Sequence, residues 1–232
     1  MARQRVATNR PQESAENRRS RVEQEIRERY PDLRVILQGD HVVLRGSFPL
    51  VHEGEVLERY VIEILIPPAF PDAEPVVREI GGRIPQTVDR HVYTNGTLCV
   101  LVPEEWFLYP DRTVLAYLDG PLRNFLIGES FVARGMPRPF GERAHHAKGL
   151  LEAYGEMVGS TEPVAIRTYL DYLGRDEVKG HWECPCGSGQ RLRNCHADYL
   201  RILRGRIPRW VARSAADRLR RQVLLEAGGK KH

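Results

Sequence analysis

The run Val56–Ile66 alternates between the two faces of a β-strand, and it limits what the chain can fold into more than any other segment. From Tyr60 to Ile66 every second side chain is aromatic or branched aliphatic, so one face of this strand is suited to burial. Pro67-Pro68 ends the run, because proline has no backbone N–H to donate to a sheet ladder. We therefore expect a sheet built around this strand.

Three shorter segments supply partner strands. Leu33–Leu37 and Val42–Arg45 precede the run and are joined by the turn-forming residues Gln38-Gly39-Asp40. Pro75–Ile80 follows it, after a proline-rich corner. Strands this closely spaced pair most simply with their sequence neighbours, so we expect a four-stranded antiparallel meander.

Helical periodicity appears on both sides of the predicted sheet. Ser14–Tyr30 carries a narrow apolar stripe, with Ser14 as the expected N-cap. Thr113–Ile127 has one apolar face, and Gly120-Pro121 is placed where it can kink the helix. Further helices are expected over Gly141–Val158, over Ile166–Leu173, and over Tyr199–Leu225 with an interruption at Pro208. The predicted fold class is therefore α+β.

The composition excludes several classes of protein. Hydrophobic residues make up 41% of the chain and charged residues 28%, as in folded globular proteins rather than disordered chains. No run of about 18 apolar residues occurs, so we expect neither a membrane span nor a membrane partner. The N-terminal stretch is polar and arginine-rich without an apolar core, so we expect no signal peptide and a cytoplasmic protein.

Three of the four cysteines and one histidine lie in a single short segment. These residues are Cys184, Cys186, Cys195 and His196. An odd number of cysteines followed by a histidine does not fit a disulfide framework in a cytoplasmic chain, and the pattern is typical of metal ligands. Cys99 stands apart. By itself it suits either a small buried hydrophobe or a reactive thiol.

Four landmarks around Cys99 resemble ubiquitin-conjugating enzymes. The proline-rich segment Ile66–Pro75 resembles the corner between that family's third and fourth strands, and Asn95–Val100 resembles its catalytic cysteine segment. Trp106 and the helix Thr113–Ile127 follow in the family's order. The resemblance covers about residues 14–130. It implies a UBC-like fold, with an N-terminal helix, the four-stranded meander, an active-site loop and C-terminal helices.

The same resemblance implies a ubiquitin-conjugating-like transferase with Cys99 as its catalytic thiol. Cys99 would carry the C-terminus of a protein as a thioester and pass it to an amine, through an oxyanion that needs a hydrogen-bond donor. His91 stands where the family has its asparagine, and it suits either this donor role or packing. Asn95 is the second candidate donor, although its place before Gly96 also suits a turn. Candidate acids for the attacking amine are Glu104, Glu105 and Glu129.

The segment 135–154 resembles an extension of bacterial ubiquitin-conjugating-like proteins. Such proteins occur in antiphage operons, including CBASS-type operons that signal through cyclic oligonucleotides. The resemblance implies a role in antiviral defence, a protein substrate such as a CBASS nucleotide cyclase or a ubiquitin-like protein, and an activating enzyme as a further partner. Glu142, His145 and His146 equally suit a solvated helix start. A non-catalytic adaptor that binds protein through the same fold and metal motif is the alternative function.

The segment Cys184–His196 closely resembles the SEC-C motif, a small zinc-binding knuckle. The resemblance implies a structural Zn²⁺ with four protein ligands and no open coordination position, used to dock a partner protein. Gly187 and Gly189 would let the loop between the ligand pairs turn tightly. The implied ligands are Cys184, Cys186, Cys195 and His196.

Residues 198–232 carry ten Lys or Arg residues against three acids, within a net charge of +4. This basic helix could track phosphates, but it has few aromatic residues for base stacking, so we expect a solvated or partner-binding face rather than nucleic-acid binding. The expected domain ranges are a flexible N-terminus (1–13), a ubiquitin-conjugating-like catalytic domain (14–159), a linker helix (160–180) and the zinc motif with its basic helix (181–232).

Overall fold

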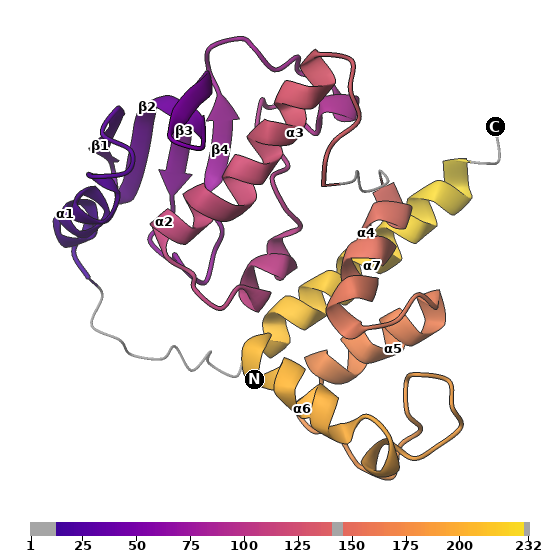
Figure 1. Cartoon of the computed structure of the whole chain (residues 1–232). Coiled ribbons are helices and arrows are strands. Elements are labelled where there is room, and N and C mark those ends of the chain that lie inside the picture. Colours follow the sequence, from indigo (N-terminus) through magenta and orange to yellow (C-terminus); the bar gives the residue numbers. More distant parts are fainter. Residues whose placement is uncertain (1–12, 141–145, 230–232) are drawn as a thin grey trace. The chain divides into compact units, whose positions relative to one another are not determined.

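The computed structural model describes residues 13–140 and 146–229 (Figure 1). It divides into two compact units. The sheet unit consists of the chain up to Val100 together with Thr113–Met136, and the helical unit consists of Leu101–Arg112 together with the chain from Pro137 on. The fold is α+β, as predicted. Glu142 and His145 lie outside the described residues, as does the side chain of His146.

The sheet unit is built on a four-stranded antiparallel sheet with the order β1-β2-β3-β4. Its strands are β1 (Leu33–Gln38), β2 (His41–His52), β3 (Glu55–Ile66) and β4 (Val76–Glu79). The meander predicted from the sequence is therefore confirmed. In β3 the side chains of Tyr60, Ile62, Ile64 and Ile66 are all buried, so the alternating run forms the inner face of the sheet.

Strand β2 extends well beyond the expected Val42–Arg45, because it continues through a glycine and a proline. Gly46 has φ +153, and a Cβ added to it would lie 2.0 Å from the carbonyl oxygen of Asp32, so only glycine fits there. Pairing with β1 ends at Gly46, and beyond it Pro49 pairs only with β3, opposite Arg59. The missing N–H of Pro49 is therefore on the unpaired side of the strand.

Three α-helices complete the described part of the sheet unit. Helix α1 (Ala15–Ile26) begins after Ser14, whose side chain accepts a hydrogen bond from the backbone N–H of Asn17 at 3.2 Å, as an N-cap does. Helices α2 (Val114–Tyr117) and α3 (Arg123–Ala133) are joined by a π-helical turn over Leu118–Leu122, which contains Pro121. The kink expected at Gly120-Pro121 is this turn, because Pro121 lacks an N–H.

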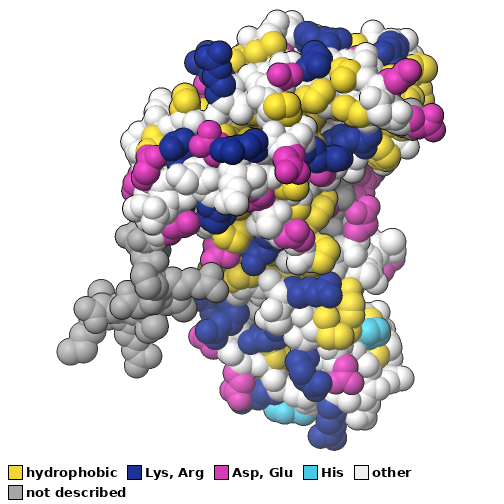
Figure 2. All heavy atoms as spheres, turned by 60° about the vertical axis from the view of Figure 1, so that its left-hand side comes forward, with side chains coloured by type: hydrophobic (Ala, Val, Ile, Leu, Met, Phe, Trp, Pro, Cys, Tyr) yellow, Lys and Arg dark blue, Asp and Glu magenta, His cyan; other side chains and the backbone are white. Residues whose placement is uncertain are grey.

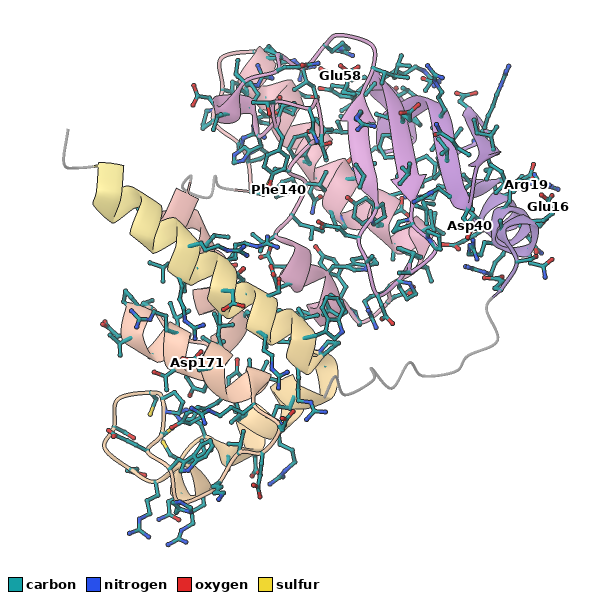
Figure 3. All side chains as sticks on the ribbon, turned by 180° about the vertical axis from the view of Figure 1, so that it is seen from behind. Glu16, Arg19, Asp40, Glu58, Phe140 and Asp171 are labelled. Carbon is teal, nitrogen blue, oxygen red and sulfur yellow. The ribbon has the colours of Figure 1, made fainter. Side chains whose placement is uncertain are left out.

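Helix α3 is fastened to the sheet by a polar network around Glu58 of β3, the residue labelled in Figure 3. Ser130 of α3 donates to Oε2 of Glu58 at 2.6 Å and lies 2.9 Å from the hydroxyl of Tyr60. Burial opposes ionisation of Glu58, but the hydrogen bond from Ser130 and the charge of Arg134 lower its pKa overall. Glu58 is therefore held as a carboxylate between strand and helix.

The helical unit contains a 3₁₀ helix over Pro103–Leu108, then α4 (His146–Val158), α5 (Pro163–Gly174), α6 (Ala197–Arg206) and α7 (Arg209–Gly229). Helices α5 and α7 lie side by side (Figure 1). The interruption of the basic helix at Pro208 is present between α6 and α7. None of the helices in the described ranges is both long enough and apolar enough to cross a membrane.

The two units differ from the expected domain ranges in three respects. Leu101–Arg112 groups with the helical unit, although it was expected within the catalytic domain 14–159. Helix α4 groups with the helical unit, because Tyr154 and Met157 are buried in the same apolar cluster as α5 and α7. Helix α5 packs against α7 and contributes Ile166, Leu170 and Leu173 to that cluster, so it is part of the core rather than a linker. The sequence pattern showed that these helices are amphipathic but not which neighbour each would cover.

Candidate functional site

The structure brings the four predicted metal ligands together. One ligand atom from each of Cys184, Cys186, Cys195 and His196 lies within 4.8 Å of all the others. The Nδ1 atom of His196 is 3.3 Å from Sγ of Cys184 and 3.1 Å from Sγ of Cys195, and the Sγ atoms of Cys186 and Cys195 are 3.6 Å apart. Tetrahedral zinc places two sulfur ligands about 3.8 Å apart and a sulfur and a nitrogen about 3.5 Å apart. The cluster is therefore compatible with a zinc-sized ion.

The knuckle is a small hairpin followed by a helix start. Backbone hydrogen bonds run from Cys184 to the carbonyl of Gln190 (2.8 Å) and from Leu192 to the carbonyl of Trp182 (2.7 Å). Gly187 and Gly189 have φ +79 and +70, which residues with a Cβ rarely adopt, so the tight turn needs glycine as the sequence indicated. The first two ligands thus come from the hairpin, while the last two lie at the start of α6.

The surroundings of two of the four ligands shift their pKa values in opposite directions. Burial raises the pKa of Cys184 to about 11, whereas a hydrogen bond with Ser188 lowers the pKa of Cys186 to about 6. A divalent cation compensates the cost of a buried thiolate at Cys184, because it brings positive charge against the sulfur. All four cysteines of the chain are thiols rather than disulfides.

Two tyrosines flank the cluster, and sequence reasoning missed both. The ring of Tyr169 on α5 meets His196 edge-on at 6.5 Å, and the ring of Tyr199 on α6 does so at 6.4 Å. Burial and the nearby cysteine charges raise the pKa of Tyr169, which keeps its hydroxyl protonated beside Cys184. The spacing of Tyr199 three residues after His196 on a helix was a usable signal, but nothing local connects Tyr169 to the knuckle.

Cys99 lies at the edge of the sheet unit, on a loop paired to β4. The backbone N–H of Leu98 donates to the carbonyl of Val77 at 2.8 Å, and Thr97 forms an isolated bridge with Arg78. The backbone N–H of Cys99 donates to the carbonyl of His91 at 2.7 Å. The cysteine side chain is half-buried rather than sealed in the core, so a reagent can approach it.

The two candidate oxyanion donors occupy different parts of this loop. His91 adopts the left-handed conformation (φ +53), and its carbonyl holds the backbone of Cys99. The side-chain oxygen of Asn95 accepts from the backbone N–H of Thr97 at 3.0 Å, so Asn95 has the turn role expected beside Gly96. Sequence reasoning missed Tyr93, whose hydroxyl donates to Sγ of Cys99 at 3.4 Å.

Two of the candidate acids are buried in ion pairs. Glu129 on α3 has a fully buried side chain, and its carboxylate accepts from Nε of Arg90 at 2.8 Å, which fixes the loop before His91. Glu104 lies in the helical unit and pairs with Arg218 of α7 at 3.3 Å. Glu105 accepts from the backbone N–H of Val102 at 3.0 Å. Each of these acids therefore has a structural role.

The arginines of α6 and α7 mostly hold the helical unit together. Arg204 donates to the carbonyls of Tyr172 and Arg175 at the end of α5, and Arg213 donates to that of Gly174 at 2.6 Å. Such contacts satisfy the last carbonyls of a helix. Figure 2 shows Lys and Arg side chains interspersed with Asp and Glu over the visible face.

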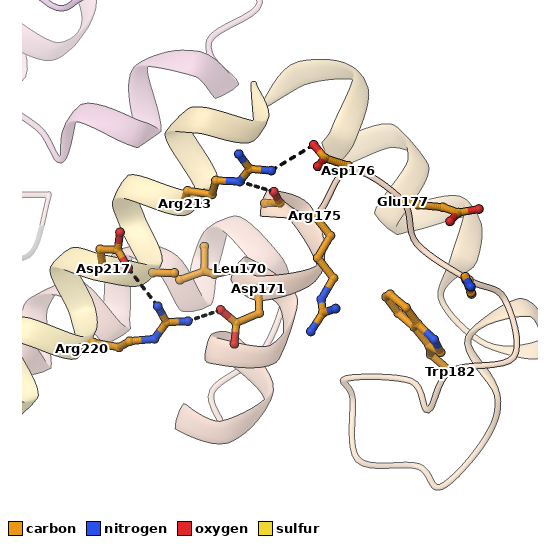
Figure 4. Close-up of a pocket in the computed structure, with 12 residues that line it drawn as sticks. Leu170, Asp171, Arg175, Asp176, Glu177, Trp182, Arg213, Asp217 and Arg220 are labelled. Carbon is orange, nitrogen blue, oxygen red and sulfur yellow. Dashed lines mark hydrogen bonds and ion pairs between the residues drawn. The ribbon is translucent and has the colours of Figure 1, made fainter. Parts of the chain in front are cut away.

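A cavity of about 700 Å³ lies within the helical unit, between α5, α7 and the segment that leads to the knuckle (Figure 4). Ion pairs join the charges that line it, at 3.0 Å from Arg213 to Asp176 and at 2.5 Å from Arg220 to Asp171. The guanidinium of Arg175 lies over the ring of Trp182 at 5.0 Å. These contacts tie α5 to α7 and leave the wall balanced in charge.

Comparison with known proteins does not identify a family for this chain. No protein-family model matches the chain, and no curated protein or solved structure matches it. A proposal for the function therefore has to be argued from the chemistry of the Cys99 loop and of the Cys/His cluster.

Proposed function

We propose that the protein is a ubiquitin-conjugating-like acyl transferase with a UBC-like sheet unit, and that Cys99 carries the acyl group as a thioester. The half-buried thiol of Cys99, on a loop paired to the edge strand β4, is the observation that carries the proposal. The order of elements supports it, because a helix, a four-stranded antiparallel meander, a cysteine loop and a kinked helix follow one another.

The proposed reaction has two steps. In the first, the Cys99 thiolate attacks the carbonyl carbon of a donor thioester, a new carbon–sulfur bond forms, and the donor's thiolate leaves. In the second, an amine attacks the same carbon, its extra proton passes to water or a base, and Cys99 leaves as a thiolate. Sulfur suits both steps, because a thiolate is a good nucleophile and a good leaving group near neutral pH.

Each step passes through an oxyanion that needs a donor. We assign this role to His91, because its left-handed backbone brings it beside Cys99 through the 2.7 Å hydrogen bond. Asn95 is the weaker candidate, since its side-chain oxygen is used in the turn with Thr97. The hydroxyl of Tyr93 donates to the sulfur itself and is suited to stabilising the thiolate before attack.

We further propose that the Cys/His cluster binds a structural Zn²⁺. Three thiolates and one imidazole form a closed tetrahedral ligand set, which leaves no position for water or substrate. The ion would hold the hairpin 180–193 against α5 and α6, where Cys184 and Leu192 are buried. A knuckle fixed in this way offers a rigid surface for docking a partner protein.

The protein partners follow from the sequence resemblance. The protein whose C-terminus is carried on Cys99 would be a CBASS nucleotide cyclase or a ubiquitin-like protein, with an activating enzyme to make the first thioester. We propose bacterial antiviral defence as the setting of this activity.

The loading step is tested directly with a chemical donor. The zinc-loaded full chain is incubated with a short peptide ending in diglycine, supplied as its mercaptoethanesulfonate thioester, and analysed by intact mass and peptide mapping. We expect one acyl group on Cys99 that dithiothreitol removes. Cys99→Ser should form an ester that survives dithiothreitol, and Cys99→Ala should form no adduct. Equal acylation of Cys99→Ala would contradict the proposal.

A non-catalytic adaptor is the alternative, and the buried state of Glu129 favours it. This acid is sealed in an ion pair with Arg90, so it is not placed to deprotonate an attacking amine. An adaptor would bind the same protein partner with equal affinity after Cys99→Ala and would show no dithiothreitol-sensitive mass. Measuring both properties on one preparation separates the two functions.

A further inference from the structure

The segment that follows Cys99 belongs to the helical unit. Residues 101–112 contain the 3₁₀ helix Pro103–Leu108 and group with α4 and α7 rather than with the sheet. Only Val100 separates Cys99 from this segment. Residues 101–112 are therefore joined to the thiol-bearing residue through a single residue of the chain.

A buried carboxylate anchors the segment. Glu104 is 2% exposed, and its two oxygens have different partners. Oε2 accepts from the hydroxyl of Tyr154 on α4 at 3.1 Å, and Oε1 lies 3.3 Å from the guanidinium of Arg218 on α7. A buried carboxylate is costly unless it is paired, so these contacts keep the 3₁₀ helix against both helices.

A second contact fixes the same segment from its apolar side. Phe107 is 6% exposed and meets the ring of Trp210 on α7 edge-on at 5.7 Å. The guanidinium of Arg112 lies 5.1 Å from the centre of the Phe107 ring. The segment is therefore held at Glu104 and at Phe107, three residues apart, and cannot shift without breaking both contacts.

We propose that Glu104, Arg218 and Tyr154 anchor the segment that directly follows Cys99 in the chain, and that loosening this segment makes the thiol less competent for acyl transfer. The proposal rests on the proposed acyl transfer at Cys99. None of the three residues touches the reacting atoms. They act by fixing the chain that leaves Cys99, because misplacement of a nucleophile by a fraction of an ångström slows an oriented reaction steeply.

The test compares two arginines of the same helix in the zinc-loaded full chain. Arg218→Met removes the cation from the anchor, whereas Arg220→Met removes an arginine that pairs with Asp171 and Asp217 and serves as the matched control. For Arg218→Met we expect amide hydrogen exchange of residues 97–112 to rise roughly tenfold while α5 keeps its protection. Acylation by the diglycine peptide thioester should fall at least about tenfold in kcat with KM unchanged.

A rescue variant separates positioning from general damage. Glu104→Gln added to Arg218→Met removes the unpaired buried charge and keeps a partner for Tyr154, so we expect it to recover most of the exchange protection and acylation rate. Arg220→Met should stay within about twofold of wild type in both measurements. Unchanged exchange at residues 97–112 in Arg218→Met, or equal effects of the two arginine variants, would overturn the anchor.

A third measurement keeps this inference separate from the proposed function. Alkylation of Cys99 by iodoacetamide, followed by peptide mapping, needs no acyl transfer, and we expect it to quicken at least threefold in Arg218→Met but not in Arg220→Met. If wild type accepts no acyl group while exchange and alkylation respond as expected, the transferase proposal fails and the anchor remains. If acylation works but exchange and alkylation do not respond, the anchor fails alone.

Discussion

Removal of the metal should destabilise the helical unit without unfolding it. The perturbation is a strong chelator added to the zinc-loaded protein, or the ligand substitution His196→Ala. Zinc fingers that fold only on their metal lose all structure when it leaves, because they have no other core. Here α4, α5 and α7 share an apolar cluster to which the knuckle contributes only two fully buried ligand-hairpin residues, Cys184 and Leu192.

The expected loss follows from those two residues. Burying a leucine side chain stabilises a fold by about 1.5–3 kcal/mol, and a buried thiol adds about 1 kcal/mol. Release of the hairpin should therefore lower the free energy of unfolding of the helical unit by about 2.5–4 kcal/mol. For a unit of this size that corresponds to a fall in Tm of about 10–30 °C. The remaining energy of metal binding is used to order the hairpin itself.

The assay is thermal unfolding followed by far-ultraviolet circular dichroism, with zinc release measured in parallel by a chromogenic chelator. We expect one zinc per chain, a helical signal that survives chelation at 20 °C, and a lower Tm that zinc restores. His181→Ala is the matched control, because this exposed histidine lies next to the knuckle and is not among the four ligands. Full zinc release with a Tm change below about 2 °C would refute the reasoning, as would complete loss of helix.

Three further outcomes are expected. Tyr93→Phe removes the hydrogen bond to Sγ of Cys99 and should slow peptide-thioester loading about tenfold, measured by single-turnover mass analysis, whereas an unchanged rate would exclude a role for that hydroxyl. Gly46→Ala should cost about 2–4 kcal/mol in urea unfolding, because its Cβ would meet the Asp32 carbonyl, and a neutral effect would contradict the close approach. Glu58 has a lowered pKa, so its stabilising effect is present above the unfolded pKa of about 4.3 and is lost as pH falls through the lower folded value. Urea midpoints measured down this pH range should fall less steeply in Glu58→Gln than in wild type, and parallel slopes would count against the network.

Much of the sheet unit could be predicted because the sequence patterns that indicate its strands each lie within one short segment. The alternation in β3 and the proline stop after Ile66 depend on neighbouring residues only, and both appear where expected. The extension of β2 could not be predicted, because Gly46 and Pro49 break the pattern on which strand prediction depends. Gly46 is required because Asp32 lies against it, and Pro49 is tolerated because pairing with β1 has ended before it. Both are properties of the folded sheet.

The candidate sites also differ in how far local sequence could predict them. The four metal ligands lie within thirteen residues of sequence, so their spacing alone predicted the cluster that the structure brings together. The contact between Glu104 and Arg218 joins residues more than a hundred positions apart, and neither side chain is unusual in its local sequence. An ion pair between residues so far apart in the sequence can be recognised only in the folded structure, where the 3₁₀ helix packs against α4 and α7.

The contacts of residues 101–112 decide which fragments of the protein can be tested. A fragment ending near residue 136 would keep the sheet, α3 and Cys99. It would also keep the four landmarks around Cys99 that resemble ubiquitin-conjugating enzymes. It would lose α4 and α7, so Glu104 would have neither Tyr154 nor Arg218 and Phe107 would have no Trp210. An unpaired carboxylate and an exposed aromatic ring would then lie a few residues after the thiol, and both favour disorder in that segment. Inactivity of such a fragment would therefore report on the loss of the helical unit's contacts and not on the chemistry of Cys99, which is why the full chain is needed to test it.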